Sequence, residues 1–238
     1  MKRRTFVATS GAVVGSALLP GARRAGAQSG GPIVLFQGDS ITDCGRDRAL
    51  TGPNNAAALG TGYPLLVASS VLAAHPRQGL RFFNRGVSGN TVPDLAARWQ
   101  ADTLDLEPNV VSILIGVNDF WHTLTGTYHG TLADYEREFG TLLARTRQAR
   151  ANSQLVVLEP FVLRTGAVTE RWFPEFDQRR AAARRVAEGV GALFIPLQTL
   201  FDGLTATTPP AYWSVDGVHP TPAGHGAIAK AWMDAVQL

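Results

Sequence analysis

Three residues of this sequence have the chemical types that nucleophilic ester hydrolysis needs. Ser40 lies in the segment Gly38-Asp39-Ser40, after an apolar run, and its hydroxyl is the candidate nucleophile. Asp216 and His219 lie three residues apart near the C-terminus. One turn can bring that carboxylate against the imidazole Nδ1–H, which leaves Nε2 to take the serine proton. The sequence therefore predicts a catalytic triad of Ser40, Asp216 and His219. The alternatives are a helix-capping serine and an incidental surface histidine.

A serine esterase also needs hydrogen-bond donors for the oxyanion of its tetrahedral intermediate. The backbone N–H of Ser40 is one candidate. Gly86 follows a second apolar run, and a glycine there lets the backbone approach a substrate closely. Asn118 follows a third apolar run and offers a side-chain amide. We expect Ser40, Gly86 and Asn118 to form the oxyanion hole, with a turn-stabilising role as the alternative for Asn118.

The elements that must position these residues alternate between strand and helix. Five short apolar runs predict strands at residues 33–36, 80–84, 110–115, 155–158 and 192–195. Amphipathic patterns between and after them predict helices at about 63–74, 92–106, 132–151, 176–189 and 222–236. This alternation is typical of one parallel sheet covered by helices on both faces. Ligands bind at the carboxyl ends of the strands in such sheets, which is where the candidate residues fall.

Longer connections are expected at residues 44–62, 120–130, 159–174 and 205–218, and several carry aromatic side chains. Aromatic residues above a sheet edge can stack on a substrate, although packing the loops down is an equally good explanation. Asp39, next to the nucleophile, is a further candidate for a substrate contact. The candidate substrate-binding residues are Asp39, Trp121, His122, Trp172 and Trp213.

The N-terminus has the pattern of an export signal. Arg3 and Arg4 form a twin-arginine pair, an apolar stretch follows over residues 6–19, and Ala25-Gly26-Ala27 is a small-residue cleavage site. The stretch is shorter than the roughly 20 residues that span a bilayer, so we expect no stable membrane anchor, with a short N-terminal anchor as the alternative. The sequence predicts a Tat-type signal at residues 1–27, a single domain at residues 28–238, and a periplasmic or extracellular location.

Charge and composition restrict the remaining possibilities. The chain holds 22 basic and 19 acidic residues, and five of the basic ones lie within residues 1–27, so no nucleic-acid-binding patch is expected. Cys44 is the single cysteine and cannot form an intrachain disulfide; we interpret it as a packed side chain rather than a second nucleophile. The sequence has no P-loop, dinucleotide fingerprint or metal-ligand spacing. We therefore expect no cofactor and no metal, and the sequence leaves open whether the protein is a homo-oligomer.

The motifs resemble, in order, the four blocks of the SGNH (GDSL) hydrolase family. The matching segments are Gly38-Asp39-Ser40, Gly86, Gly116-Val117-Asn118-Asp119 and Asp216-Gly217-Val218-His219. The resemblance implies a flavodoxin-like three-layer α/β/α fold with a five-stranded parallel sheet. It also implies that Ser40, Gly86, Asn118 and His219 are the four residues that name the family, with Asp216 completing the triad.

Longer strings are similar to the bacterial acetylxylan-esterase-type members of that family. These strings are residues 38–44, 88–92 and 97–100. The resemblance implies a secreted esterase that removes short acyl groups, acetyl above all, from a plant polysaccharide or oligosaccharide. Two alternatives stay open: a lipid-directed esterase or lysophospholipase of the same family, and a non-catalytic carbohydrate-binding module.

Overall fold

Five parallel strands form the centre of the molecule. The computed structural model describes residues 30–238, and the expected export signal lies outside them. The strands are β1 (Ile33–Gly38), β2 (Arg81–Asn84), β3 (Val110–Leu114), β4 (Gln154–Leu158) and β5 (Leu193–Ile195). Their order in the sheet is β2-β1-β3-β4-β5, and every neighbouring pair is parallel. The expected five-stranded parallel sheet is therefore confirmed.

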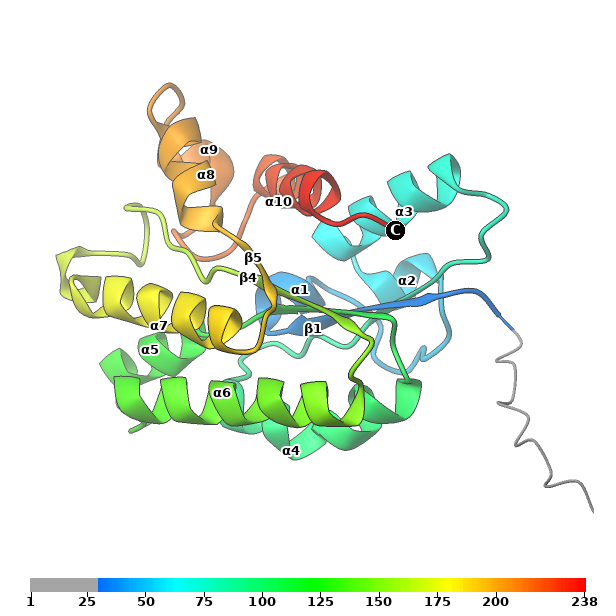
Figure 1. Ribbon diagram of the computed structural model, residues 1–238. Helices are drawn as coiled ribbons and strands as arrows, with labels where there is room; N and C mark the ends of the chain where they lie inside the picture. Colours follow the sequence, from blue (N-terminus) through cyan, green and yellow to red (C-terminus); the bar gives the residue numbers. More distant parts are fainter. Residues whose placement is uncertain (1–29) are drawn as a thin grey trace, which may run out of the picture.

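Helices cover both faces of this sheet (Figure 1). One face carries α3 (Tyr63–Ala74) and α10 (Pro222–Ala235), which pack against each other. The opposite face carries α4 (Val92–Asp102), α6 (Leu132–Ala149) and α7 (Glu175–Gly189). The remaining helical segments are α1 (Ser40–Asp43), α2 (Ala56–Leu59), α5 (Val117–Thr125), α8 (Leu197–Thr205), α9 (Pro210–Trp213) and the 3₁₀ turns η1 (Leu104–Leu106) and η2 (Glu170–Trp172). The result is the three-layer α/β/α sandwich that the sequence predicted.

The strands alternate their side chains between two apolar cores. In β4, Val156 and Leu158 belong to the core that includes α3 and α10, whereas Leu155 and Val157 belong to the core that includes α4, α6 and α7. This period of two follows from the pleat of a strand, and both sets are apolar because both faces are covered. Trp232 of α10 crosses to β3 and donates its indole N–H to Ser112 at 2.9 Å. The cores thus fix the sheet whose carboxyl edge holds the candidate residues.

Some expected boundaries were wrong. Residues 117–125 form helix α5, although a loop was expected from residue 120. The helix expected to reach residue 106 ends at Asp102, and the chain continues as η1 after an irregular Thr103. Helix α8 occupies a segment for which no helix was predicted. Within residues 30–238, no helix is long and apolar enough to span a bilayer.

Candidate active site

The candidate residues lie at the carboxyl ends of the neighbouring strands β1 and β3, from which the chain runs to opposite sides of the sheet. From β1 the chain leads to β2 on one side, while β3, on the other side, leads outward to β4 and β5. Such a switch point is where open parallel sheets bind ligands. Ser40 follows β1 and Asn118 follows β3. Gly38 has a φ of +153°, and a Cβ there would lie 2.2 Å from the Leu114 oxygen, so only glycine lets the chain turn at this point.

Three side chains form a continuous hydrogen-bond chain at this edge. Ser40 Oγ lies 2.9 Å from His219 Nε2, and His219 Nδ1 lies 2.8 Å from Asp216 Oδ2. A carboxylate can only accept at Nδ1, so Nδ1 carries the proton and Nε2 is left to accept the hydroxyl hydrogen of Ser40. The imidazole and the carboxylate remain partly exposed, with 40% and 32% of their side chains accessible. The structure therefore brings the three predicted triad residues together.

The Asp216 carboxylate also holds its own loop in shape. Oδ1 accepts the backbone N–H groups of Val218 at 2.9 Å and His219 at 2.8 Å. Burial alone would raise the pKa of Asp216, but the hydrogen bonds from His219 and Val218 lower it below its usual value. Gly217 has a φ of +93° and lies too close to Leu163 and Thr165 for any side chain. The carboxylate is thus charged and fixed, as a group that orients an imidazole must be.

Gly86 does not offer a free donor, which corrects the sequence prediction. Its N–H donates to Asn84 Oδ1 at 2.8 Å, and its oxygen accepts from Arg46 Nε at 2.7 Å. A Cβ on Gly86 would lie 2.5 Å from the Asp43 nitrogen, so the glycine is needed for close packing against α1. Gly86 is buried and both of its backbone polar groups are already bonded, so it cannot serve an oxyanion.

Gly89, three residues further on, has the property that Gly86 lacks. It is exposed, and its N–H has no acceptor within residues 30–238. The neighbouring Asn90 oxygen accepts Asn118 Nδ2 at 3.1 Å, so Gly89 lies beside the predicted amide donor. The Ser40 N–H is likewise unbonded in the described part of the chain. The sequence signal for Gly89 was its place in the Ser88-Gly89-Asn90 string, where spacing alone did not separate it from Gly86.

Asp39 is too deeply buried to touch a substrate, so that prediction was wrong. Its side chain caps α1 by accepting the Ile41 N–H at 3.0 Å, and the residue is 1% exposed. Burial raises the pKa of Asp39 to about 7, and burial likewise raises the pKa of Asp119 to about 7. Asp119 accepts the Val92 N–H at 2.9 Å and so joins α5 to the start of α4. Sequence reasoning missed this structural role of Asp119.

Of the predicted substrate-binding rings, one contacts a residue of the triad. Trp121 lies with its ring centroid 6.1 Å from that of His219 and is half-buried, on helix α5 rather than on a loop. Trp172 is 2% exposed, packs behind Trp121 and bonds the Ala167 oxygen, so a substrate cannot reach it and that prediction was wrong. Within residues 30–238, no hydrogen bond or ring contact joins the other two candidates, His122 on α5 and Trp213 on α9, to a triad residue.

Cys44 contacts the last helix of the fold. Its Sγ lies 3.2 Å from His225 Nε2, while His225 Nδ1 accepts the Tyr63 N–H at 3.2 Å. Burial lowers the pKa of His225 to about 4, so the ring is neutral and its proton sits on Nε2. His225 therefore cannot act as a base toward Cys44. No cluster of three or more metal-ligating side chains occurs in the described part of the chain.

Comparisons with known proteins agree with this geometry. Residues 36–227 match the GDSL-like Lipase/Acylhydrolase family. Over 207 residues, the chain is 37% identical to an acetylxylan esterase of Geobacillus stearothermophilus, covering 85% of this chain and 93% of that protein.

Solved structures extend the likeness to three dimensions. A GDSL-like protein of Parabacteroides merdae has a TM-score of 0.84 at 45% identity, covering 87% of this chain and 95% of that one. Axe2, the acetylxylan esterase of Geobacillus stearothermophilus, has a TM-score of 0.78 at 35% identity, with 88% and 95% covered. The chain belongs to the GDSL-like lipase/acylhydrolase family of hydrolases, with the SGNH hydrolase fold.

Proposed function

We propose that the protein is a serine esterase that removes acetyl groups from a plant polysaccharide or its oligosaccharides. The observation that carries this proposal is the hydrogen-bond chain from Ser40 through His219 to Asp216. It lies beside the Ser40 and Gly89 N–H groups, which have no acceptor in the part of the chain that the structure describes. Membership of an acylhydrolase family supports ester hydrolysis, and the likeness to acetylxylan esterases supports the acetyl group and the sugar.

The proposed reaction begins with attack by Ser40 Oγ on the ester carbonyl carbon. His219 Nε2 takes the hydroxyl proton as the new C–O bond forms, and Asp216 stabilises the imidazolium. His219 then gives this proton to the leaving sugar oxygen as the ester C–O bond breaks, which leaves an acetyl-serine. A water molecule, deprotonated by His219, attacks the acetyl-serine, and acetate leaves as the proton returns to Ser40.

Three donors are proposed for the oxyanion. Two are the backbone N–H groups of Ser40 and Gly89, which replaces Gly86 in this role. The third is Asn118, whose Nδ2 carries two hydrogens and uses one on the Asn90 oxygen, leaving the other for the substrate. Losing one donor of this kind typically slows the reaction about 10²–10³-fold.

The test of the proposed function is acetate release from acetylated xylo-oligosaccharides, together with a series of 4-nitrophenyl esters of increasing acyl length. We expect acetate release and rates that fall beyond about four acyl carbons, because a site adapted to acetyl discriminates against longer chains. Ser40→Ala is the control and should lose the activity in every assay. Rates that rise with chain length, with turnover of lysophospholipid, would favour the lipid-directed alternative. Sugar binding without ester turnover would favour the binding module.

We also propose that the protein is exported through residues 1–27. The twin-arginine pair, the short apolar stretch and the Ala-Gly-Ala segment support this. The test is N-terminal sequencing of the protein recovered outside the cytoplasm, where we expect Gln28 as the first residue. Replacing Arg3 and Arg4 with lysine should keep the full-length chain in the cytoplasm. An uncleaved N-terminus on exported protein would contradict the proposal.

A further inference from the structure

The loop before Gly89 has its backbone N–H groups bonded one after another. In order, the N–H groups of Gly86, Val87 and Ser88 donate to the Asn84 side chain, the Gly38 oxygen and the Asp43 carboxylate, at 2.8, 3.0 and 2.9 Å. The N–H of Asn90 turns back to the Val87 oxygen at 3.1 Å. The loop therefore leaves one N–H, that of Gly89, without an acceptor in the described part of the chain.

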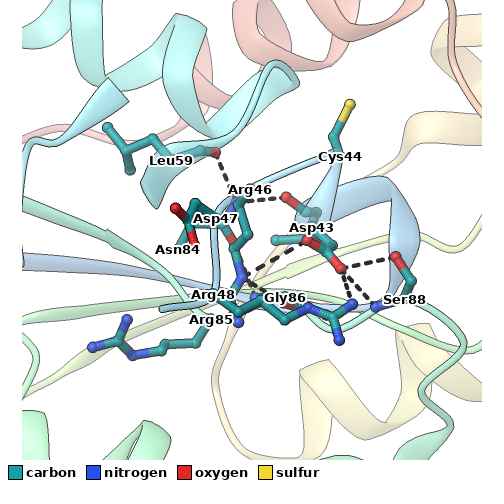
Figure 2. A network of polar contacts seen from close by, with 12 residues as sticks. Asp43, Cys44, Arg46, Asp47, Arg48, Leu59, Asn84, Arg85, Gly86 and Ser88 are labelled. Atoms are coloured by element: carbon teal, nitrogen blue, oxygen red, sulfur yellow. Dashed lines mark hydrogen bonds and ion pairs between the residues drawn. The ribbon is translucent and has the colours of Figure 1, made fainter. Parts of the chain in front are cut away.

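Asp43 is the last of these anchors before the free N–H. It lies in α1, three residues after Ser40, and is 3% exposed. Its Oδ2 accepts both the N–H and the Oγ–H of Ser88, at 2.9 and 2.8 Å, and also bonds Arg48 (Figure 2). Burial would raise the pKa of Asp43, but the hydrogen bonds from Arg48 and Ser88 lower it, so the carboxylate is charged.

Arg46 ties the same loop to the same helix from a second point. Its Nε donates to the Gly86 oxygen at 2.7 Å and lies 3.8 Å from Asp43 Oδ1. Only 5% of its side chain is exposed. Figure 2 shows these groups gathered around Asp43, with Cys44 pointing away from them. Bonds to a charged, buried group are stronger than neutral ones, so this arrangement holds the loop with little freedom.

We propose that Asp43 is a positioning residue that fixes the Gly89 N–H relative to Ser40 Oγ. The nucleophile and the carboxylate lie within one turn of helix. The bonded N–H of Ser88 and the free N–H of Gly89 belong to consecutive peptide groups. The nucleophile and the oxyanion donor thus belong to one rigid unit. The inference rests on the proposed function, because it assigns Gly89 a role in stabilising the oxyanion. Misplacing a catalytic group by about 1 Å can cost about 10²-fold in rate.

The test is Asp43→Asn, with Asp47→Asn as the matched control. Asp47 is exposed, and within residues 30–238 its carboxylate accepts one bond, from the Ala49 N–H at 2.9 Å, so its variant should match the unsubstituted protein. With 4-nitrophenyl acetate we expect Asp43→Asn to lower kcat about 10- to 100-fold, with KM changed less than about twofold, because the donor acts mainly in the transition state. The Ki of phenylboronic acid should rise in proportion, since its tetrahedral adduct with Ser40 places an oxygen in the oxyanion hole.

The outcomes separate positioning from general stabilisation. An unchanged kcat and boronate Ki would overturn the proposal, and so would a rise in KM alone. If Asp43→Asn does not fold, Ser88→Ala decides instead, because it removes only the Oγ bond and should lower kcat and weaken boronate binding by a smaller, equal factor. No change in Ser88→Ala would then overturn the proposal. If the unsubstituted protein and Asp47→Asn hydrolyse no ester, the proposed function has failed rather than this inference.

Discussion

Asn118 Nδ2 lies 3.1 Å from the backbone oxygen of Asn90 and donates a hydrogen bond to it. This bond joins the loop after β2 to the start of α5, which follows β3. It fixes the plane of the amide, because a rotated amide would place its oxygen against the Asn90 oxygen. The second Nδ2 hydrogen then has one fixed direction. A donor held in place before the substrate arrives needs no reorganisation during the reaction, which is the condition for strong oxyanion stabilisation.

Asn118→Ala should therefore lower kcat about 10²–10³-fold toward 4-nitrophenyl acetate, with a smaller effect on KM. Asn118→Asp should lower it further, because a carboxylate would repel both the Asn90 oxygen and the developing oxyanion. The control is Asn152→Ala, on an exposed turn before β4. If Asn118→Ala retained the kcat of the unsubstituted protein, the amide would have no part in oxyanion stabilisation.

Asp216→Asn should preserve the conformation of its loop but prevent His219 from acting as a base toward Ser40. An amide oxygen at Oδ1 can still accept the N–H groups of Val218 and His219. The amide NH₂ then faces Nδ1, which favours the tautomer with the proton on Nε2, and that nitrogen can no longer accept from Ser40. The corresponding change in a known serine protease lowers kcat about 10⁴-fold. Steady-state kinetics near neutral pH and a thermal melt measure both parts of the prediction. A variant with unchanged kcat would rule out a role for Asp216 in orienting His219.

Much of the fold could be predicted because the strands carry an unambiguous signal. Val110–Leu114 is apolar on both faces apart from Ser112 and follows Pro108 and Asn109, so the sequence places it in a covered sheet. Helix α5 could not, because Gly116 and the polar residues that follow it are equally typical of a loop. What makes α5 a helix is tertiary packing, as Phe120 is buried against Trp172 and Phe176.

The sequence predicted the site residues that act through a reactive side chain better than those that act through a backbone N–H group. Ser40, Asp216 and His219 stand out because their types and order suit one reaction. Gly86 and Gly89 are the same residue type on one loop, and what separates them is the Asn84 side chain, which bonds the first and not the second. Such a difference depends on contacts between distant segments, so the spacing of the glycines in the sequence does not predict it.

Asp39→Asn should alter how stability depends on pH. Burial raises the pKa of Asp39 to about 7 in the folded protein, against about 3.8 when unfolded. The folded state therefore holds a proton that the unfolded state releases between these values, and this contribution to stability is lost as pH rises through 7. Asparagine caps a helix as well as aspartate and does not titrate. The melting temperature of the unsubstituted protein should fall more steeply from pH 5 to pH 9 than that of Asp39→Asn.

The pH comparison needs a control because other groups titrate in the same range. Burial lowers the pKa of His225 to about 4, so its titration destabilises the folded protein as pH falls below about 6.5. The titration of Asp119 destabilises the folded protein as pH rises, as that of Asp39 does. Both are present in either protein, so His225 cancels in the difference, whereas Asp119, whose charge acts on Asp39, cancels only in part. Asp234→Asn, at an exposed ion pair with Lys230, should run parallel to the unsubstituted curve. Parallel curves for Asp39→Asn would show that Asp39 is ionised alike in both states.

Trp121 and Trp172 allow a matched test of which aromatic residue meets the sugar. Trp121 is half-buried beside His219, so Trp121→Ala should lower kcat/KM for acetylated xylo-oligosaccharides about fivefold more than for 4-nitrophenyl acetate, the loss expected from about 1 kcal/mol of stacking. Trp172→Phe should leave that ratio unchanged and lower the free energy of unfolding by about 1–3 kcal/mol, because the smaller ring leaves a cavity beside Phe120 and Phe176. Equal losses on both substrates in Trp121→Ala would assign its ring to supporting His219 rather than to binding the sugar.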